Sequence, residues 1–177
     1  MEIVGKCIIE RINKMAEIMT RDEAYRKLAA RCTVKECCVS EVREKLHNWN
    51  IARVDEDSIV AQLLEERFID ECRYSRAFVN DQFRFAGWGR IKISYTLRQK
   101  SIDSLTISQA VQTIDEEEYR RSLLHILSVK MRSIKALSSQ MQGDKLMRFA
   151  MSRGFEPQLI RECLKELSLE CEGGSEI

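Results

Sequence analysis

Apolar positions along the chain recur in three units, whose anchor residues Ile51, Ile102 and Phe155 stand 51 and 53 residues apart. Each anchor has apolar residues nine positions before it (Val42, Ile93, Leu146), five before it (Leu46, Leu97, Ala150) and twelve after it (Leu63, Ile114, Leu167). A tyrosine opens each unit, at Tyr25, Tyr74 and Tyr119. A period of tens of residues with helical spacing inside it indicates a helical repeat array, which offers an extended surface rather than a pocket.

Three helices are predicted in each unit, because the apolar residues lie three and four positions apart. In the first unit we expect three helices. The first spans 22–32, and the second begins at an N-cap at Ser40 and runs through the apolar stripe at 42–49. The third runs from 55 to about 69. In the second unit we expect helices over 73–85, over the stripe at 93–97 and over the stripe at 107–114, with a break at Gly87–Gly89.

In the third unit we expect one helix from Glu116 to Ser139 and a second that opens after Gly143. Gly154 suits the left-handed position just beyond a helix, and Pro157 suits the first turn of the last helix.

The absence of period-two runs makes the predicted fold all-α: three tandem three-helix repeats that form an elongated, curved array. The predicted divisions are an N-terminal extension over 1–20, repeats over 21–70, 71–115 and 116–168, and a disordered acidic tail over 169–177. Residues 1–20 carry a helical apolar face. They either pack on the first repeat or form a mobile extension whose true start codon is Met15 or Met19.

Composition narrows the class of protein. With 32% charged and 44% hydrophobic residues and one proline, the chain resembles a helical protein of the cytoplasm, and no run approaches the ~18 apolar residues of a membrane span. The seven cysteines are expected to be reduced, several as small core residues. Cys32, Cys37, Cys38 and His47 do not have zinc-site spacing, so no metal is expected.

Charge is segregated although the net charge is only +1. Asp55–Glu71 holds seven acids against Arg67, whereas Glu71–Lys100 holds seven bases against two acids, and Tyr119–Gly143 holds bases and no acid. This pattern favours an acidic protein surface or a nucleic-acid backbone as the partner of the second and third repeats.

Catalytic motifs are absent from the sequence. There is no Gly-rich phosphate loop, no paired-carboxylate signature and no H-E-x-x-H, and neither His47 nor His125 belongs to a nucleophile motif. No enzyme activity, catalytic residue or cofactor is therefore predicted.

The segment FIDECRYSRAFVNDQFRFAGWGRIKISYTLRQKSI, from Phe68 to Ile102, resembles the central signature of the RecX family, regulators of the RecA recombinase. The matching positions are Phe68, Asp70, Arg73, Tyr74, Ala77, Phe78, Val79, Gly89, Arg90, Ile91, Leu97, Lys100 and Ile102. SRGFEPQLI, from Ser152 to Ile160, resembles the family's Arg-Gly-Phe ending, and the resemblance covers about residues 22–168. Ser101 departs from the pattern, because the family has glycine there. A left-handed serine would cost about 1 kcal/mol.

The resemblance implies a monomeric regulator that binds the RecA–DNA filament and inhibits RecA recombinase, ATPase and coprotease activity, in DNA recombination, repair and the SOS response. The alternative is a helical-repeat protein that acts directly on single- or double-stranded DNA. The low net charge favours the filament.

The candidate partner-binding residues are Arg73, Arg76, Arg84, Trp88, Arg90, Lys92, Arg98 and Lys100. Some have structural alternatives. The first three arginines either form a contact face or pair with acids at 65–70, and Trp88 is either an exposed anchor or packs over the joint between two helices. One of Phe83 and Phe85 is expected in the core, and the three tyrosines are expected to pack rather than stack on bases.

Overall fold

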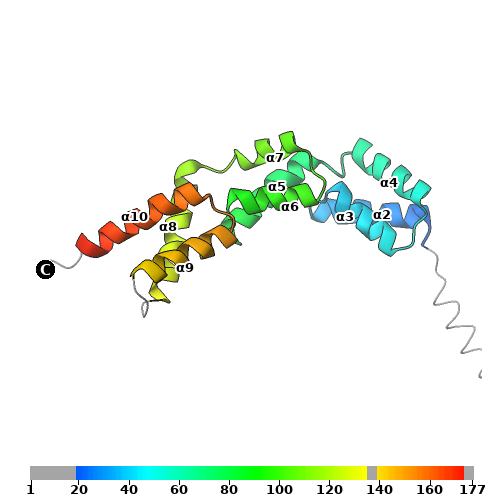
Figure 1. Cartoon of the computed structure of the whole chain (residues 1–177). Helices are drawn as coiled ribbons and strands as arrows, with labels where there is room; N and C mark the ends of the chain where they lie inside the picture. Colours follow the sequence, from blue (N-terminus) through cyan, green and yellow to red (C-terminus); the bar gives the residue numbers. More distant parts are fainter. Residues whose placement is uncertain (1–18, 135–138, 174–177) are drawn as a thin grey trace, which may run out of the picture. The chain divides into compact units, whose positions relative to one another are not determined.

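A computed structural model of the chain describes residues 19–134 and 139–173 (Figure 1). The chain divides into two compact units, Met1–Asp70 and Glu71–Ile177. The first unit contains α2 (Arg21–Val34), α3 (Val39–Asn48) and α4 (Arg53–Glu65). The second contains α5 (Glu71–Arg84), α6 (Arg90–Gln99), α7 (Ser104–Val111), α8 (Glu116–Arg132), α9 (Ser139–Ser152) and α10 (Pro157–Gly173). Over the described residues every element is a helix, so the prediction of an all-α protein built from three-helix repeats is confirmed.

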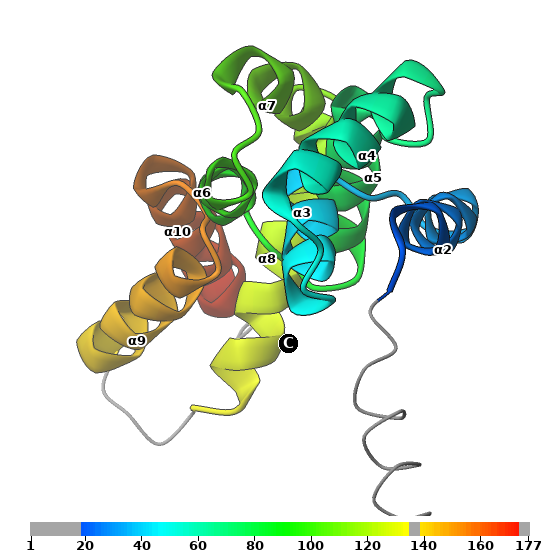
Figure 2. The same cartoon turned by 90° about the vertical axis from the view of Figure 1, so that its right-hand side faces the viewer.

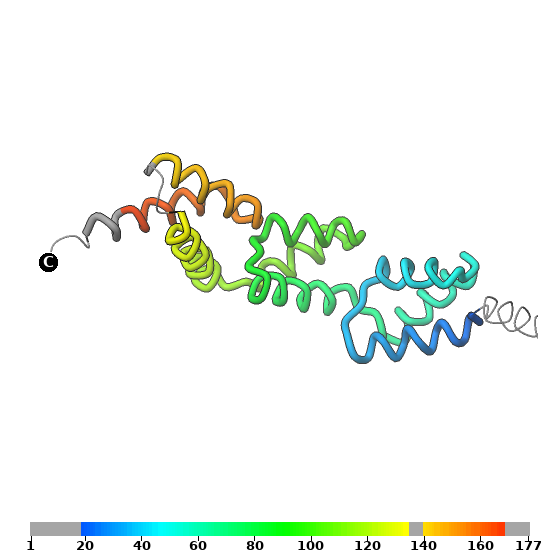
Figure 3. Tube along the Cα trace, turned by 90° about the horizontal axis from the view of Figure 1, so that it is seen from below, coloured from blue at the N-terminus to red at the C-terminus, as the bar shows by residue number. Residues whose placement is uncertain are grey.

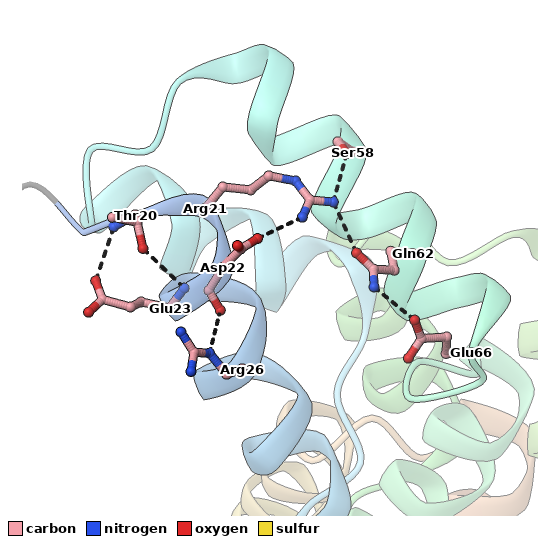
Figure 4. Close-up of polar contacts among 8 residues, drawn as sticks. All are labelled: Thr20, Arg21, Asp22, Glu23, Arg26, Ser58, Gln62 and Glu66. Carbon is pink, nitrogen blue, oxygen red and sulfur yellow. Dashed lines mark hydrogen bonds and ion pairs between the residues drawn. The ribbon is translucent and has the colours of Figure 1, made fainter.

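Local capping explains how α2 begins (Figure 4). The hydroxyl of Thr20 accepts a hydrogen bond from the Glu23 amide at 3.3 Å, and the Glu23 carboxylate accepts one from the Thr20 amide at 3.2 Å. The Arg21 guanidinium then donates to Ser58 and Gln62 on α4, both at 3.0 Å. The capping box therefore starts α2, and Arg21 in its first turn bonds the helix to α4.

The predicted apolar positions form the core. Leu46 and Leu97 are fully buried, Leu167 is 7% exposed, and the other repeated positions on the second helices, Val42, Ile93 and Leu146, are buried as well. Two of the opening tyrosines, Tyr74 and Tyr119, are buried, and the half-buried Tyr25 donates its hydroxyl hydrogen to Glu66. The periodic pattern was therefore a packing signal, as predicted.

The second helix of each repeat ends in the same turn. Asn50, Ser101 and Gly154 have positive φ angles of 54°, 63° and 86°. After each of them an amide donates back to the carbonyl five residues earlier: Ile51 to Leu46, Ile102 to Leu97 and Phe155 to Ala150, at 3.1–3.2 Å. This is the Schellman arrangement, in which a left-handed residue stops the helix. Ser101, which departs from the family's glycine, thus takes this left-handed position with a side chain present.

One predicted cap is wrong. Ser40 does not cap α3, because the helix begins at Val39 and the N-cap position belongs to Cys38, which makes no capping side-chain bond. The Ser40 hydroxyl lies 3.2 Å from the Cys38 sulfur instead. Burial of Cys37, Cys38 and Val42 sets where this helix starts, and the local preference of serine for caps is overridden.

The predicted helix boundaries in the third repeat are also wrong. The helix expected to reach Ser139 ends at Arg132, where the Ser133 amide and hydroxyl both donate to the Lys130 carbonyl and tighten the last turn. Gly143 does not precede α9 but lies inside it, and a Cβ placed there would meet nothing within 4 Å. An isolated glycine in open space costs only about 1 kcal/mol of helix propensity, so it does not break the helix.

The tail predicted to be disordered over 169–177 is helical as far as Gly173, since α10 continues there without interruption. Residues 174–177 lie outside the described part of the chain, as do residues 1–18 of the predicted N-terminal extension. Among the helices that the structure describes, none combines the length and the apolar run that crossing a bilayer requires.

Candidate partner-binding surface

The turn between α5 and α6 is joined to the turn between α9 and α10 through backbone contacts, and these turns carry the AGWGR and SRGF motifs (Figure 2). The Gly89 amide donates to the Arg153 carbonyl at 2.8 Å, and the Ile91 amide donates to the Gly154 carbonyl at 3.0 Å. A Cβ on Gly89 would come within 2.2 Å of the Gly154 oxygen, and one on Gly154 within 2.3 Å of the Lys92 Cβ. Both positions therefore require glycine, because the two backbones touch.

Tyr119 closes the same joint from α8. Its ring is fully buried between Phe83 and Phe155, with centroid separations of 5.7 and 5.1 Å. Its hydroxyl accepts a hydrogen bond from the Arg90 amide at 2.9 Å and donates one to Glu156 at 2.8 Å. The free amides of the first turn of α6 are thus bonded by the third repeat, which orients α6.

Arg90, a candidate partner-binding residue, is engaged inside the unit and is not a freely exposed cation. Its guanidinium donates to both carboxylate oxygens of Glu116, at 3.0 and 2.9 Å, and to the Ile114 carbonyl at 3.2 Å. It also lies 4.2 Å from the Tyr119 ring centroid, and its side chain is only 19% exposed. Arg90 therefore links α6 to the start of α8. Its sequence position inside a basic run did not reveal this, because the partner acids lie 26 residues away.

The three predicted arginines of α5 are exposed and, with Asn80, follow one side of the helix at spacings of three and four residues. Arg84 lies 3.4 Å from Glu118, so its acid partner comes from α8 and not from the acids at 65–70. The Arg76 side chain makes no polar contact with the described part of the chain. Arg73 lies one turn before it.

The exposed aromatic residue near the end of α5 is Phe85 and not Trp88. Phe85 is 83% exposed, whereas Phe83 is in the core, which answers the question that the sequence left open. Trp88 is half-buried in the turn, its amide bonded to the Gln82 carbonyl at 3.0 Å, and the Lys92 ammonium lies 4.3 Å from its ring centroid. The structure thus pairs two predicted site residues, Trp88 and Lys92, in a cation–π contact.

Two exposed residues on α6, Ile91 and Tyr95, were missed by the sequence analysis, although Arg98 on the same side of the helix was predicted. Ile91, Tyr95 and Arg98 are exposed at spacings of four and three residues, opposite the buried Ile93 and Leu97. We call Ile91, Tyr95 and Arg98 the α6 row. Arg98 makes no side-chain polar contact over the described residues, and Tyr95 accepts a hydrogen bond from Gln99 at 2.9 Å. The sequence could have shown this row, since Ile91, Tyr95 and Arg98 stand four and three residues apart and off the apolar stripe of Ile93 and Leu97.

Lys100, the last predicted site residue, is half-buried at the end of α6, with its ammonium 5.9 Å from the Tyr74 ring centroid. The structure therefore separates the eight predicted residues into two groups. Arg76 and Arg98 are exposed and make no polar side-chain contact over the described residues, whereas Arg73, Arg84, Trp88, Arg90, Lys92 and Lys100 make contacts within the chain.

Three cysteines of the first unit pack as core residues. Cys32, Cys37 and Cys38 are buried at the turn between α2 and α3. Burial, followed by the neighbouring Cys37, raises the pKa of the Cys32 thiol to about 12. This thiol is therefore protonated at neutral pH and behaves as a small apolar side chain.

Comparison with known proteins finds relatives in sequence and in fold. The family model for RecX, second three-helix domain, matches residues 70–111, which contain α5, α6 and α7. Regulatory protein RecX of Clostridium botulinum (strain Eklund 17B / Type B) is 30% identical over 159 residues, which cover 87% of this chain and 71% of that protein. Regulatory protein RecX of Lactococcus lactis subsp. lactis is 27% identical over 140 residues, covering 77% of this chain and 52% of that protein.

Two solved structures share the fold. The crystal structure of RecX from Lactobacillus salivarius has a TM-score of 0.74 at 17% identity and covers 84% of this chain and 97% of its own. A crystal structure of regulatory protein RecX has a TM-score of 0.76 at 18% identity, covering 89% of this chain and 77% of its own. These structures show that the fold is shared, and the 30% identity to regulatory protein RecX over 87% of the chain shows that this chain belongs to the RecX family of regulatory proteins.

Proposed function

We propose that this chain binds the RecA–DNA filament and lowers the recombinase, ATPase and coprotease activities of RecA. The observation that carries the proposal is membership of the RecX family, at 30% identity over 87% of the chain. The proposed role is that of a binding protein with no catalytic step of its own.

The α5–α6 surface supports contact with a protein as well as with phosphates. Arg76 and Arg98 are exposed cations without a polar partner over the described residues, and Phe85, Ile91 and Tyr95 are exposed apolar side chains. Phosphate contacts require cations alone, whereas protein interfaces are enriched in aromatic residues and arginine at their centre. We propose that the α6 row and Arg76 lie at the centre of the contact, with Arg73, Arg84, Trp88, Arg90, Lys92 and Lys100 around it.

The fixed position of α6 also supports this role. Its first turn is bonded to the third repeat through Gly154 and Tyr119, so the α6 row is held on a rigid element before a partner arrives. Pre-organised residues lose less conformational freedom on binding, which favours affinity.

Direct DNA binding is the second candidate, favoured by the seven bases against two acids over Glu71–Lys100. Arg84 and Arg90 of this set are engaged with Glu118 and Glu116, which leaves fewer cations to neutralise phosphates. For each phosphate contact on duplex DNA, the logarithm of the affinity falls with a slope of about −0.9 against the logarithm of salt concentration. A DNA-binding protein should therefore show a steep salt dependence, and a filament-binding protein a shallower one.

The test measures co-sedimentation of the chain with RecA on single-stranded DNA, with the same DNA lacking RecA as the control. ATP hydrolysis by RecA is followed in parallel while excess duplex DNA is added at near-physiological salt. We expect co-sedimentation to require RecA, and inhibition to scale with RecA protomers and to persist in the presence of duplex. Equal sedimentation without RecA, or inhibition abolished by sub-stoichiometric duplex, would replace the proposal with direct DNA binding.

A further inference from the structure

A pocket of about 260 Å³ lies in the third repeat and is formed by α8 and α9, which pack against each other in the yellow to gold part of Figure 3. Ile126, Val129 and Phe149 supply apolar walls, and Lys130 and Arg153 supply cations. Val129 is 50% exposed at this wall. The pocket thus presents apolar surface to any molecule that approaches α8 and α9.

The size of the pocket limits what it holds. Sites for drug-sized ligands and cofactors span about 300–1,000 Å³. A volume of about 260 Å³ suits one aromatic or branched aliphatic side chain, inserted from outside. The natural occupant is therefore part of a larger molecule that lies over the pocket.

The described part of the chain places no carboxylate beside the cations at the pocket. The Lys130 ammonium lies 5.4 Å and the Arg153 guanidinium carbon 5.0 Å from the Phe149 ring centroid. Arg153 is held there by a 2.8 Å hydrogen bond to the Ala86 carbonyl. Over the described residues neither cation pairs with a carboxylate, and no acid occurs between Tyr119 and Gly143. The pocket therefore has an apolar floor and a positive rim.

Charge and lining together identify the partner's chemistry. We propose that the pocket between α8 and α9 is a docking site for an acidic protein segment, which inserts one large apolar side chain between Ile126, Val129 and Phe149 and places flanking carboxylates beside Lys130 and Arg153. A nucleotide fits less well. Its base would stack on an aromatic face, and two cations already lie over the Phe149 ring. The proposal holds whether or not the partner is a RecA filament.

Fluorescence anisotropy of the full chain tests this with a labelled peptide in which one phenylalanine lies between runs of aspartate. A second peptide has alanine in place of phenylalanine, and a third has asparagine in place of aspartate. Val129→Glu puts a carboxylate into the pocket. Val54→Glu makes the same change at a valine that is 82% exposed on α4, and serves as its matched control. Circular dichroism melting establishes that both variants fold.

We expect saturable binding that weakens about tenfold or more when phenylalanine becomes alanine, since burying an aromatic side chain supplies an effect of that order. Binding should weaken similarly with the asparagine peptide and in Val129→Glu, and remain unchanged in Val54→Glu. If Val129→Glu unfolds, Lys130→Gln is used, and its affinity should depend less on salt than that of the unmodified chain.

Three results would overturn the proposal. One is the absence of saturable binding at peptide concentrations up to about 1 mM, since a site with a Kd of about 1 mM would be half occupied there. Another is equal affinity for the phenylalanine and alanine peptides. The third is displacement of the peptide by a thymidine oligonucleotide that itself binds in a Val129-dependent manner, which would assign the pocket to nucleic acid.

Discussion

Arginine side chains in one basic run of this chain have opposite roles. Arg90 makes two bonds to Glu116, one to the Ile114 carbonyl and a contact with the Tyr119 ring, whereas Arg76 extends into solvent without a polar partner over the described residues. The energetic difference comes from burial. An exposed ion pair contributes ~0–1 kcal/mol, but a bond to a partly buried carbonyl cannot be replaced by water at the same site.

Arg90→Ala should therefore lower the free energy of unfolding by about 1–3 kcal/mol, because it leaves the Ile114 carbonyl unpaired and uncovers the Tyr119 ring. Arg76→Ala, an arginine-to-alanine change on an exposed helix face, should stay within about 0.5 kcal/mol. Urea denaturation followed by circular dichroism measures both. Equal losses in the two variants would show that the Arg90 contacts carry no net stability.

Tyr119 provides a second test at this scale. Burial, the largest cause, raises the pKa of its phenol, and the hydrogen bond to Glu156 acts in the same direction. The unfolded chain loses this proton near pH ~10, whereas the folded chain retains it. The stability that Tyr119 contributes is therefore complete below about pH 10 and decreases as the pH rises beyond it.

Tyr119→Phe should lose about 1–3 kcal/mol at pH 7, because the Arg90 amide and the Glu156 carboxylate lose a shared partner. Above pH 10 its free energy of unfolding should fall less steeply than that of the unmodified chain. The residual slope would come from groups such as Tyr25 and Cys32, whose pKa values are also raised. Unfolding curves between pH 7 and 11 measure the two slopes, and identical slopes would rule out Tyr119 as their source.

At the scale of elements, one turn design serves the second helix of all three repeats. Asn50, Ser101 and Gly154 each adopt a left-handed conformation at the same place in the repeat, and the following amide closes the same hydrogen bond. Only in the third repeat must the residue be glycine, since there the Lys92 backbone and Cβ occupy the space that a side chain would need. The identity of the turn residue is thus set by tertiary contact in one repeat and by local conformation in the others.

Two glycine-to-alanine changes separate these effects. Gly143→Ala should raise the free energy of unfolding by about 0.5–1 kcal/mol, because it lies inside α9 with nothing within 4 Å of a Cβ. Gly154→Ala should lower it by about 2–4 kcal/mol, since the left-handed backbone and the overlap with Lys92 are both unfavourable. Thermal and urea unfolding measure both changes. A loss of stability in Gly143→Ala would mean that Gly143 marks a helix boundary after all.

At the scale of the whole molecule, the net charge is only +1, but the acidic and basic residues lie in separate segments of the chain. This pattern favours a partner that contacts one region of the chain. The second unit presents exposed cations and apolar residues on α5 and α6, while the contacts of Gly89, Tyr119 and Arg153 join its two repeats into one body. A filament-binding protein needs such an ordered surface, because it must recognise a protein shape and not a phosphate chain alone.

Arg76→Glu with Arg98→Glu should reduce inhibition of RecA by about tenfold or more while leaving the melting temperature nearly unchanged, because neither side chain has a polar partner over the described residues. Reversal at Arg90 is left out, since that residue stabilises the joint. The control is Lys27→Glu with Arg31→Glu on α2, an equal change in net charge at exposed positions. The rate of ATP hydrolysis by RecA measures inhibition by both double variants. An equal loss of inhibition in the control would show that the effect comes from net charge and not from Arg76 and Arg98.

Helical spacing and the fifty-residue repeat can be read directly along the chain. The sequence by itself therefore determined the all-α class, the three-helix repeats and the buried leucines. Helix ends were predicted less well. Ser40 and Gly143 have local preferences of about 1 kcal/mol, which packing overrides.

Tertiary structure alone decided which residues of the basic run remain available to a partner. Arg90 is bonded to an acid 26 residues away, Arg153 donates to a carbonyl 67 residues away, and the apolar pocket on the third repeat arises only when α8 and α9 pack. Sequence spacing shows which residues share a face of one helix. Exposure depends on what another helix places against that face, and this is settled only when the chain folds.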